Sequence, residues 1–298
     1  MSVFSKLFKI IMTIKFSNFI KNIFFKSANE KKIFYVDSYI ELKKFEESIS
    51  QELIISIDTE FDWRNTYYPI LSLIQVSTKK EIFLIDCIQI NNPGLLNELI
   101  NTQDKLFIFH SVKSDTTTLS SSAGIKITNV FDVQVAEKLI SKKIKNYADI
   151  VFKYCSIHID KSETNSNWLK RPLTENQMKY AANDVKYLIE IFKKQKKILK
   201  EMNLYGEACA ISKREATLGN QKLHISRLKK LKKANYYEKT LFYWREKIAS
   251  EMNLPPSYIF KNKRSKELIK SVIDHDEKKL LEILKNKKAV KSIILEFK

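Results

Sequence analysis

After residue 32, short apolar runs alternate with polar turns, a pattern typical of β-strands. The runs are rich in β-branched and aromatic residues, which suit the pleated surface of a sheet. Four of them predict strands: Leu53–Phe61, Leu71–Thr78, Glu81–Cys87 and Lys105–His110. Because consecutive strands usually lie beside one another, we expect all four in one sheet.

Beyond these runs, apolar residues recur every three to four positions or the composition favours helix. Four helices are predicted: Asp115–Ala123, Asp132–Ser141, Tyr147–Cys155 and a long helix from Thr174 to about Met202. Thr174 with Gln177 has the form of a capping box, and Pro172 lies just ahead, so the long helix should begin there. Strands followed by helices predict a mixed α/β domain.

A second region follows a change of composition between residues 204 and 220, where Gly206 and Gly219 stand among mixed polar residues. Beyond it, an apolar repeat has helical spacing: Leu241, Trp244, Ile248 and Met252. We therefore expect three parts: an apolar basic extension over residues 1–32, an α/β domain over 33–204 and a helical domain over 205–298.

The basic charge is concentrated at the two ends of the chain. Lys and Arg total 53 against 34 Asp and Glu, a formal net charge of +19. Residues 1–32 carry +6, residues 33–204 only +1, and residues 205–298 carry +12. This distribution favours a polyanionic partner, either nucleic acid or an anionic membrane surface. A lysine-rich solvated surface in a compositionally biased protein is the alternative.

The three cysteines lie far apart, and neither they nor the four histidines have the spacing of a zinc site or a disulfide framework. A reducing compartment, the cytoplasm, is therefore expected. Residues 1–30 contain too many lysines for a transmembrane helix and lack a signal-peptide cleavage pattern. They fit an organelle-targeting peptide or an interfacial helix, or else a plain extension with the true start at Met12.

Two carboxylates stand at alternate positions of the first predicted strand, Asp58 and Glu60, and therefore share one face of the sheet. Like charges this close raise each other's pKa unless a cation compensates them, and Mg²⁺ or Mn²⁺ prefers such oxygen ligands. Solvated acids at a strand edge are the alternative.

Two further segments carry candidate residues. Asp115 follows a predicted strand, where it could also serve only as a helix N-cap. Tyr180 and Asp184 stand four apart on the long helix, one turn from each other. A tyrosine there can orient a water molecule whose attack is assisted by metal ions that the aspartate helps to bind.

Taken together, these segments resemble ribonuclease D, of the DEDD 3′-5′ exonucleases, in its tyrosine-bearing branch. The resemblance covers roughly residues 33–204 and rests on three stretches: Asp58–Phe61 continuing through Thr66–Pro69 and Leu73–Val76; His110–Asp115 with Phe131–Gln134; and Trp168–Thr174 continuing through Gln177, Tyr180 and Asp184 to Leu188. More loosely, Trp244–Ala249 and Asn253–Pro256 resemble the HRDC domain that follows in ribonuclease D. The family often carries two such domains, whereas this chain has room for one.

The resemblance implies an RNase H-like fold followed by an all-α HRDC-like domain, and a 3′-5′ exoribonuclease that releases mononucleotides. It makes Asp58, Glu60, Asp115 and Asp184 the ligands of two divalent ions, Mg²⁺ or Mn²⁺, with Tyr180 orienting the attacking water. The implied substrate is RNA with a single-stranded 3′ end, such as a tRNA precursor. His110 is expected to be structural.

Two alternatives stay open: a DNA exonuclease with the same metal site, and a non-catalytic RNA-binding module. Contacts to nucleic acid are expected from Phe61, which would stack on the terminal base, and from a basic cluster that would hold phosphates. The cluster consists of Arg227, Lys229, Lys230, Lys232 and Lys233. A core phenylalanine and a solvated helix face are the corresponding structural interpretations.

Overall fold

The computed structural model describes residues 31–97, 104–228, 231 and 233–297. The expectations for residues 1–30 and for Lys229, Lys230 and Lys232 concern residues outside these ranges. The chain forms two compact units, of which the first holds residues up to Phe61 together with Leu71–Asn220. Asp62–Ile70 and the residues from Gln221 onward form the second. Within the described ranges, no helix combines the length and apolarity needed to cross a bilayer.

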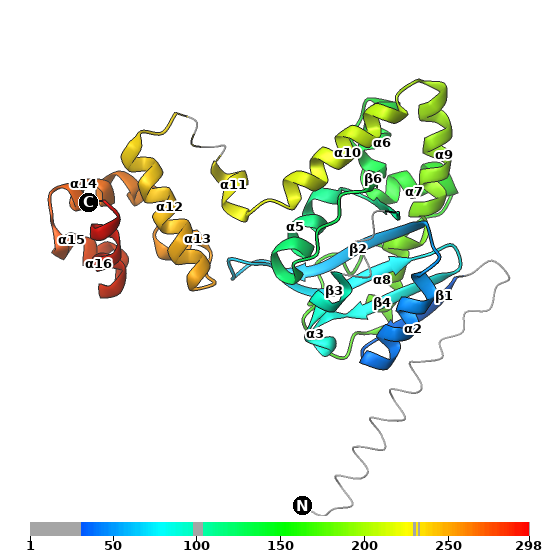
Figure 1. The fold of residues 1–298 in the computed structure, drawn as a ribbon, viewed down its shortest axis with the longest axis horizontal. Helices are drawn as coiled ribbons and strands as arrows, with labels where there is room; N and C mark the ends of the chain where they lie inside the picture. The colour runs from blue at the N-terminus through cyan, green and yellow to red at the C-terminus, as the bar shows by residue number, and fades with distance from the viewer. Residues whose placement is uncertain (1–30, 98–103, 229–230, 232, 298) are drawn as a thin grey trace, which may run out of the picture. The chain divides into compact units, whose positions relative to one another are not determined.

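The first unit is organised around a six-stranded mixed sheet with the order β1-β4-β3-β2-β5-β6 (Figure 1). Its strands are β1 (Lys32–Val36), β2 (Ile54–Asp62), β3 (Ile70–Ser77), β4 (Glu81–Asp86), β5 (Leu106–Phe109) and β6 (Val130–Asp132). β2 pairs in parallel with β5, and β5 with β6, so the carboxyl ends of these three strands lie at one edge. β3 and β4 are antiparallel.

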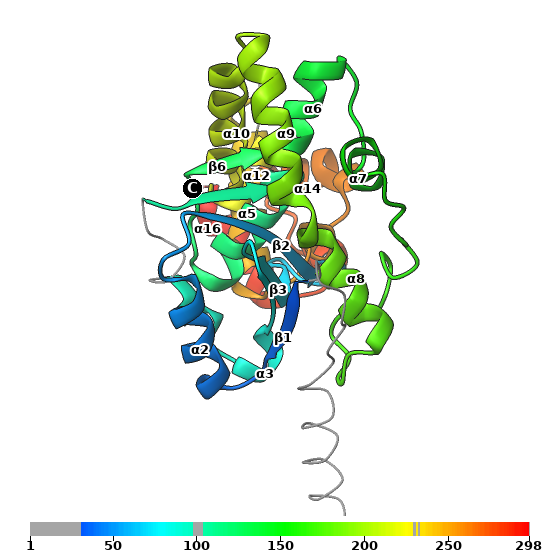
Figure 2. The same cartoon turned by 90° about the vertical axis from the view of Figure 1, so that its right-hand side faces the viewer.

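Helices cover both faces of this sheet. Along β4 the side chains alternate: Phe83 and Ile85 enter one apolar core, whereas Ile82 and Leu84 enter the other. The first core is closed by α2 (Tyr39–Ile49) and α5 (Val112–Ala123). The second is closed by α6 (Val133–Ser141), α7 (Tyr147–Cys155), α8 (Glu175–Lys186) and α9 (Leu188–Glu201). Figure 2 shows α2 and α8 on opposite sides of the strands.

The four predicted strands are confirmed to within one residue at each end, and α7 has the predicted bounds. Other elements were not predicted from the sequence: β1, α2, β6 and the short helices α3 (Cys87–Ile90) and η1 (Pro93–Leu95). β6 is only three residues long and fully buried, so it shows no alternation of apolar and polar positions.

The predicted long helix is divided at Tyr187 into α8 and α9. The Tyr147 hydroxyl donates to the Asn183 carbonyl oxygen at 2.9 Å, and the Tyr187 backbone N–H interacts with the same hydroxyl. Asn183 and Tyr187 are four residues apart, so the hydroxyl sits where an intrahelical hydrogen bond would form. Insertion of a side chain into the series of backbone hydrogen bonds along a helix is a known cause of helix kinks. Here the inserted side chain comes from α7.

Helix α10 (Tyr205–Gly219) belongs to the first unit, although we expected a boundary at residues 204–205. Its Ser212 hydroxyl accepts the Asp132 backbone N–H at 3.0 Å, and Ser212 is fully buried. Its apolar residues Ala208 and Ala216 are also buried. The two compact units therefore divide after Asn220, because α10 completes the packing around α5 and β6.

The second unit is helical. Its elements are α11 (Leu223–Leu228), α12 (Tyr236–Glu251), α13 (Pro256–Ile259), η3 (Asn262–Arg264), α14 (Ser265–Ile273), α15 (Glu277–Leu284) and α16 (Lys287–Glu296). Trp244 is fully buried at the centre of its apolar core, as its helical spacing predicted.

The loop between β2 and β3 is part of this second unit and is anchored by polar contacts. The Tyr67 hydroxyl donates to the buried Glu246 carboxylate at 2.9 Å, and Arg227 donates to the same oxygen at 2.7 Å. The Asn253 side-chain oxygen accepts the backbone N–H groups of Tyr67 and Tyr68. Tyr67 is 3% exposed, so its side chain anchors the loop in the helical unit, whereas Arg64 and Asn65 are exposed.

Gly219 tests the packing of α10 on α5. A Cβ atom at Gly219 would lie 2.0 Å from the Thr116 hydroxyl and 2.6 Å from the Lys113 carbonyl oxygen. We expect Gly219→Ala to lower the free energy of unfolding by about 1–3 kcal/mol, the usual cost of overpacking. Gly206→Ala, in the same helix with open space around its Cβ position, is the matched control and should be neutral or stabilising. Equal chemical-denaturation midpoints for the two variants would contradict this packing.

Candidate active site

Four acidic side chains from three elements converge in the first unit. Asp58 and Glu60 come from β2, Asp115 from the first turn of α5, and Asp184 from α8. Burial, and then the negative charges of Asp115, Asp184 and Glu60, raise the pKa of Asp58, so the four carboxylates lie close enough to repel one another. The fold therefore brings together the acids that the sequence predicted to act as one site.

Burial and mutual repulsion make these carboxylates poor acids. Burial, with the charges of Asp184 and Asp115, raises the pKa of Glu60 to about 9. Burial raises the pKa of Asp184 to about 7 and that of Asp115 to about 6, although hydrogen bonds from Tyr180 and Thr59 respectively favour their charged forms. Four such groups ionised together at neutral pH require a positive charge nearby.

Asp115 is held in place by its neighbours. The Thr59 hydroxyl donates to its Oδ1 at 2.7 Å, and the side chain is 3% exposed. The N-cap of α5 is Ser111, whose φ of 63° is left-handed, so the alternative that Asp115 is merely an N-cap is wrong. Asp132 instead accepts the backbone N–H groups of Ser111 and Val112, which frees Asp115 to face the other acids.

Tyr180 lies one helical turn before Asp184 and is half-buried. Its hydroxyl is 3.2 Å from the Thr164 hydroxyl and interacts with Asp184, and its ring lies 5.8 Å from that of Trp168. Burial, and then the charge of Asp184, raises the pKa of Tyr180 above its usual range. The phenol therefore keeps its proton at neutral pH, and in this structure that single proton is directed to Asp184.

The donor set of this site suits a hard divalent cation, because all four acids offer oxygen atoms and their charges repel one another. Within the described ranges, no three acidic, histidine or cysteine side chains are already grouped at metal-binding distances. Mg²⁺ usually takes only one or two protein carboxylates and completes its shell with water and phosphate oxygens. The acids therefore fit a site whose coordination is completed by water and substrate.

Tyr147 is a residue near the site that the sequence analysis did not single out. It is buried, the charges of Asp184 and Asp58 act on it, and burial raises its pKa. Its hydroxyl fixes the backbone turn that carries Asp184. Only its position at the start of α7 was visible in the sequence, and nothing there indicated a contact with residue 183. His110 packs its ring against Tyr147, and burial lowers its pKa, as expected of a structural histidine.

Of the other predicted residues within the described ranges, Phe61 belongs to the first unit, and Arg227 and Lys233 belong to the second. Phe61, directly after the β2 acids, is half-buried and belongs to neither apolar core of the first unit. Arg227 does not project freely as a phosphate-binding cation, because it is paired with the buried Glu246 and its guanidinium lies 5.1 Å from the Tyr67 ring centre. Lys233 is exposed.

Comparison with known proteins gives concordant results. A family model described as 3′-5′ exonuclease matches residues 33–200. Ribonuclease D of Desulfotalea psychrophila is 31% identical over 241 residues, which are 74% of this chain and 62% of that protein. This chain therefore spans about three fifths of the length of that relative.

Two solved structures share the fold. Escherichia coli RNase D, described as an exoribonuclease involved in structured RNA processing, has a TM-score of 0.77 at 20% identity, covering 90% of this chain and 75% of that one. Trypanosoma brucei RNase D, solved in complex with RNA U12, has a TM-score of 0.51 at 20% identity, covering 55% of this chain and 62% of that one. The RNase H-like exonuclease fold of the first unit is thereby confirmed.

The raised pKa values predict how the metal-free protein responds to pH. In the folded chain these acids hold protons up to pH 6–9, whereas in the unfolded chain they ionise near pH 4. Unfolding therefore releases protons, and stability should fall as pH rises from about 4 to about 9. In a chelator, we expect the melting temperature to fall across this range. Mn²⁺ should restore it.

Asp58→Asn should flatten this pH dependence and remove the stabilisation by Mn²⁺. Glu46→Gln, an exposed acid on α2, is the control and should behave like the unsubstituted chain. A melting temperature that rises with pH in chelator, or Mn²⁺ stabilisation that survives in Asp58→Asn, would refute the shared carboxylate site.

Tyr147→Phe removes the hydroxyl that links α7 to the backbone beside Asp184. We expect a decrease of about 1–3 kcal/mol in unfolding free energy, as for other buried polar groups left without a partner. The Mn²⁺ concentration needed for half-maximal thermal stabilisation should also rise, because Asp184 shares that turn. Tyr154→Phe, on the same helix, removes a buried hydroxyl bonded to Glu137 at 2.8 Å and serves as the control. It should lower stability without changing the Mn²⁺ requirement, and equal requirements in both variants would reject a positioning role for Tyr147.

Proposed function

This chain belongs to the 3′-5′ exonuclease family, and from that premise we propose that it is a metal-dependent exoribonuclease of the ribonuclease D type. It hydrolyses phosphodiester bonds at RNA 3′ ends and releases 5′-mononucleotides. The observation that carries the proposal is the convergence of four buried or half-buried carboxylates, one of them held by Thr59, with a protonated tyrosine one helical turn from Asp184. Such a set of oxygen donors suits hard divalent cations.

Asp58, Glu60, Asp115 and Asp184 are the proposed ligands of two divalent ions, Mg²⁺ or Mn²⁺. When bound, a pair of such ions stabilises the charge on the attacking and leaving oxygens of a phosphodiester displacement. The raised pKa values mean that the acids give up protons as cations enter, so binding should be tighter at higher pH.

The chain's own residues supply orientation. When cations hold Asp184, the single O–H of Tyr180 can turn from that carboxylate to a water molecule and leave a lone pair of the water directed at the terminal phosphate. Thr59 keeps Asp115 in its rotamer, and the Tyr147 hydroxyl fixes the turn that presents Asp184. Phe61 offers an apolar surface beside the acids for the terminal base. Holding reactants in this way lowers the entropy cost of the reaction.

The proposed substrate is RNA with a single-stranded 3′ end, such as a tRNA precursor. A relative solved with bound RNA supports this choice. We infer that the second unit is an HRDC-like module that grips phosphates without reading sequence. It is rich in lysine and exposes the aromatic side chains of Tyr236 and Tyr258.

A DNA exonuclease with the same site is the second candidate, since the carboxylates do not distinguish a 2′-hydroxyl from hydrogen. The only support for this candidate is that the same metal site could cleave either nucleic acid. A non-catalytic RNA-binding module is disfavoured, because all five catalytic positions hold side chains able to act and the fold brings four of them into one electric field.

Activity on matched RNA and DNA strands tests the proposal. With Mn²⁺, the chain should release 5′-mononucleotides from a uniformly labelled single-stranded RNA, and a chelator should stop the reaction. Asp184→Asn should abolish turnover, and Tyr180→Phe should slow it on the order of 10²-fold, the scale for removing one group that positions a reacting water. Both variants should bind RNA in chelator as the unsubstituted chain does. No release from RNA or DNA would refute an enzyme, and release from DNA alone would replace this substrate assignment.

A further inference from the structure

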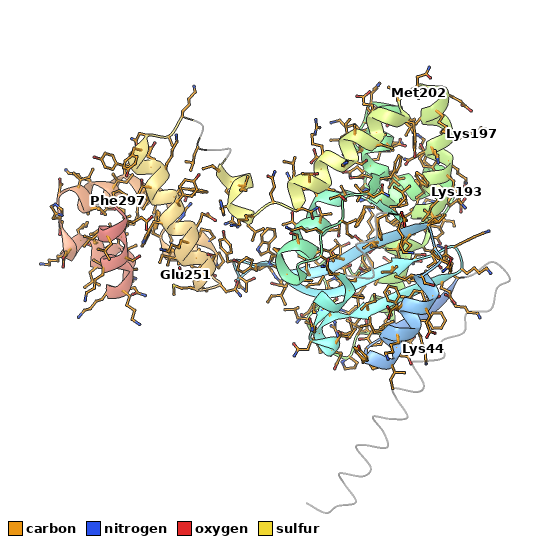
Figure 3. All side chains as sticks on the ribbon, viewed as in Figure 1. Lys44, Lys193, Lys197, Met202, Glu251 and Phe297 are labelled. Atoms are coloured by element: carbon orange, nitrogen blue, oxygen red, sulfur yellow. The ribbon has the colours of Figure 1, made fainter. Side chains whose placement is uncertain are left out.

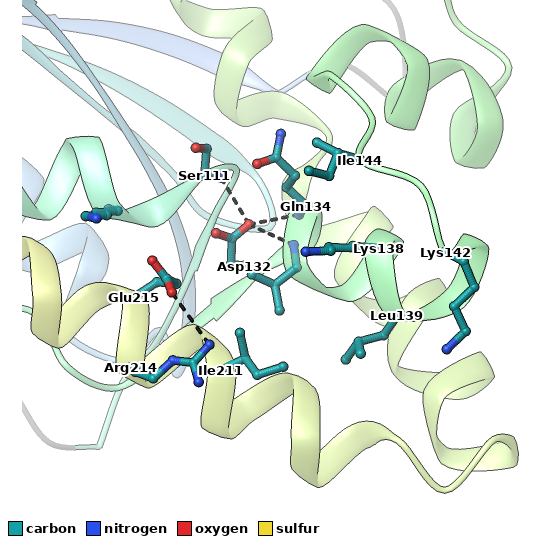
Figure 4. A pocket seen from close by; sticks show the side chains of 12 residues that line it. Ser111, Asp132, Gln134, Lys138, Leu139, Lys142, Ile144, Ile211, Arg214 and Glu215 are labelled. Carbon is teal, nitrogen blue, oxygen red and sulfur yellow. Dashed lines mark hydrogen bonds and ion pairs between the residues drawn. The ribbon is translucent and has the colours of Figure 1, made fainter.

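A pocket of about 540 Å³ opens between the start of α5, the length of α6 and the second half of α10 (Figure 4). It is separate from the four acids, none of which lines it. Its walls combine two kinds of side chain. The apolar ones are Val135, Leu139, Ile144 and Ile211, and the basic ones are Lys113, Lys138, Lys142 and Arg214.

The basic side chains are available to a ligand. Within the described ranges, Lys113, Lys138 and Lys142 make no ion pair, and all three are exposed. Arg214 has only a loose pair with Glu215 at 3.8 Å. The other acid of the pocket, Asp132, is already used, because its carboxylate accepts backbone N–H groups at the starts of both α5 and α6. The pocket therefore carries four basic side chains against two carboxylates, those of Asp132 and Glu215, and has a net positive charge.

This concentration of positive charge is not a general property of the first unit. Residues 33–204 carry a net charge of only +1, and four of their acids are gathered at the candidate metal site. Four basic side chains against two acids around one cavity therefore stand out from the average. Their apolar floor includes Ile144, which is 70% exposed. A ligand with an anionic part and a flat apolar part would satisfy both walls.

The position of the pocket connects it with the acids. In parallel sheets, ligands bind at the carboxyl ends of the strands. β2, β5 and β6 are parallel neighbours, so their carboxyl ends share one edge. The acids Asp58 and Glu60 lie toward the end of β2, whereas Ser111 and Asp132 of the pocket lie at the ends of β5 and β6. The pocket therefore begins at the carboxyl end of β5, which is the neighbour of the β-strand that carries Asp58 and Glu60.

We propose that this pocket binds a nucleotide unit upstream of the one being cleaved, with its base on the apolar floor and its phosphate on the lysine rim. This assignment rests on the proposed function, because it places the RNA strand across the shared sheet edge. The pocket fixes the strand by its backbone and accepts any base, since its floor offers apolar contact and its rim offers charge. A free 5′-mononucleotide has the same chemistry and is the other source of such a ligand.

The test measures binding of 5′-labelled uridine oligonucleotides of two and six residues in chelator, where no strand is cut. In the double variant Lys138→Ala/Lys142→Ala, binding of the hexanucleotide should weaken. The slope of log K against log salt should become shallower by about 0.7 for each phosphate that the removed lysines would neutralise. Ile144→Ser should weaken binding of the hexanucleotide but not of a strand whose upstream residues lack bases.

Lys193→Ala/Lys197→Ala, which removes the same charge from exposed positions on α9, is the matched control (Figure 3). It should leave the salt slope near that of the unsubstituted chain. Equal weakening of hexanucleotide binding in the two double variants would show that net charge alone matters and would overturn the assignment of the pocket. Full hexanucleotide binding by Lys138→Ala/Lys142→Ala would overturn it as well. Competition by uridine 5′-monophosphate at equal strength would assign the pocket to a free nucleotide instead of the strand, and would overturn the upstream assignment.

The proposed function is checked separately by mononucleotide release from RNA by the unsubstituted chain. Failure of that reaction with normal oligonucleotide binding would count against the enzyme and not against a nucleotide pocket. Normal release with unchanged binding in the pocket variants would count against the pocket alone.

Discussion

Repulsion among four carboxylates is the constraint on which the rest of the first unit depends. Asp58, Glu60, Asp115 and Asp184 are each partly or fully buried, and each is surrounded by others of the same sign. Bringing such groups together costs folding free energy at neutral pH, because burial and repulsion both oppose ionisation. Another favourable interaction must offset this cost in free energy. For a set of carboxylate oxygens, that interaction is cation binding.

Much of the surrounding structure holds these acids despite their repulsion. The Thr59 hydroxyl donates a hydrogen bond to Asp115. The Asp132 carboxylate accepts a backbone N–H group at the start of α5, so Asp115 is not needed to cap that helix. Tyr147 inserts its hydroxyl into the backbone between α8 and α9, one residue from Asp184. The two apolar cores on either side of the sheet then supply rigid supports for these contacts. Close placement of charged groups of this kind is what catalytic sites require.

The division of the chain into two units does not follow the sequence order, because the β2–β3 loop belongs to the second unit. The β2–β3 loop, which continues from the strand that carries Asp58 and Glu60, is held inside the helical unit by Tyr67 and its contacts with Glu246 and Asn253. Arg227, which the sequence suggested as a phosphate contact, is used in this internal network. Basic charge counted along a sequence therefore does not equal charge available to a ligand, and the three pocket lysines of the first unit are better placed for that role.

The four strands could be predicted because alternation along a strand is a local signal, and local spacing likewise put Asp58 with Glu60 and Tyr180 with Asp184 on shared faces. Asp115 had no such signal, and only the resemblance to ribonuclease D grouped it with the other four candidates. It could not predict contacts made by distant segments. The break at Tyr187 depends on a hydroxyl from residue 147, and α10 joined the first unit because Ser212 and Gly219 fit against β6 and α5. The pocket likewise gathers residues from positions 111 to 215, whose charges in sequence resemble scattered surface lysines.

The most direct test of the central claim is calorimetric titration of the metal-free chain with Mn²⁺ at pH 7 in two buffers of different ionisation enthalpy. If the four acids form the cation site, the ion should bind saturably and displace protons, so that the apparent enthalpy differs between the buffers. Asp184 and Glu60, whose pKa values are about 7 and about 9, are the expected sources of those protons. Binding without proton release, or no saturable binding at millimolar Mn²⁺, would contradict the account.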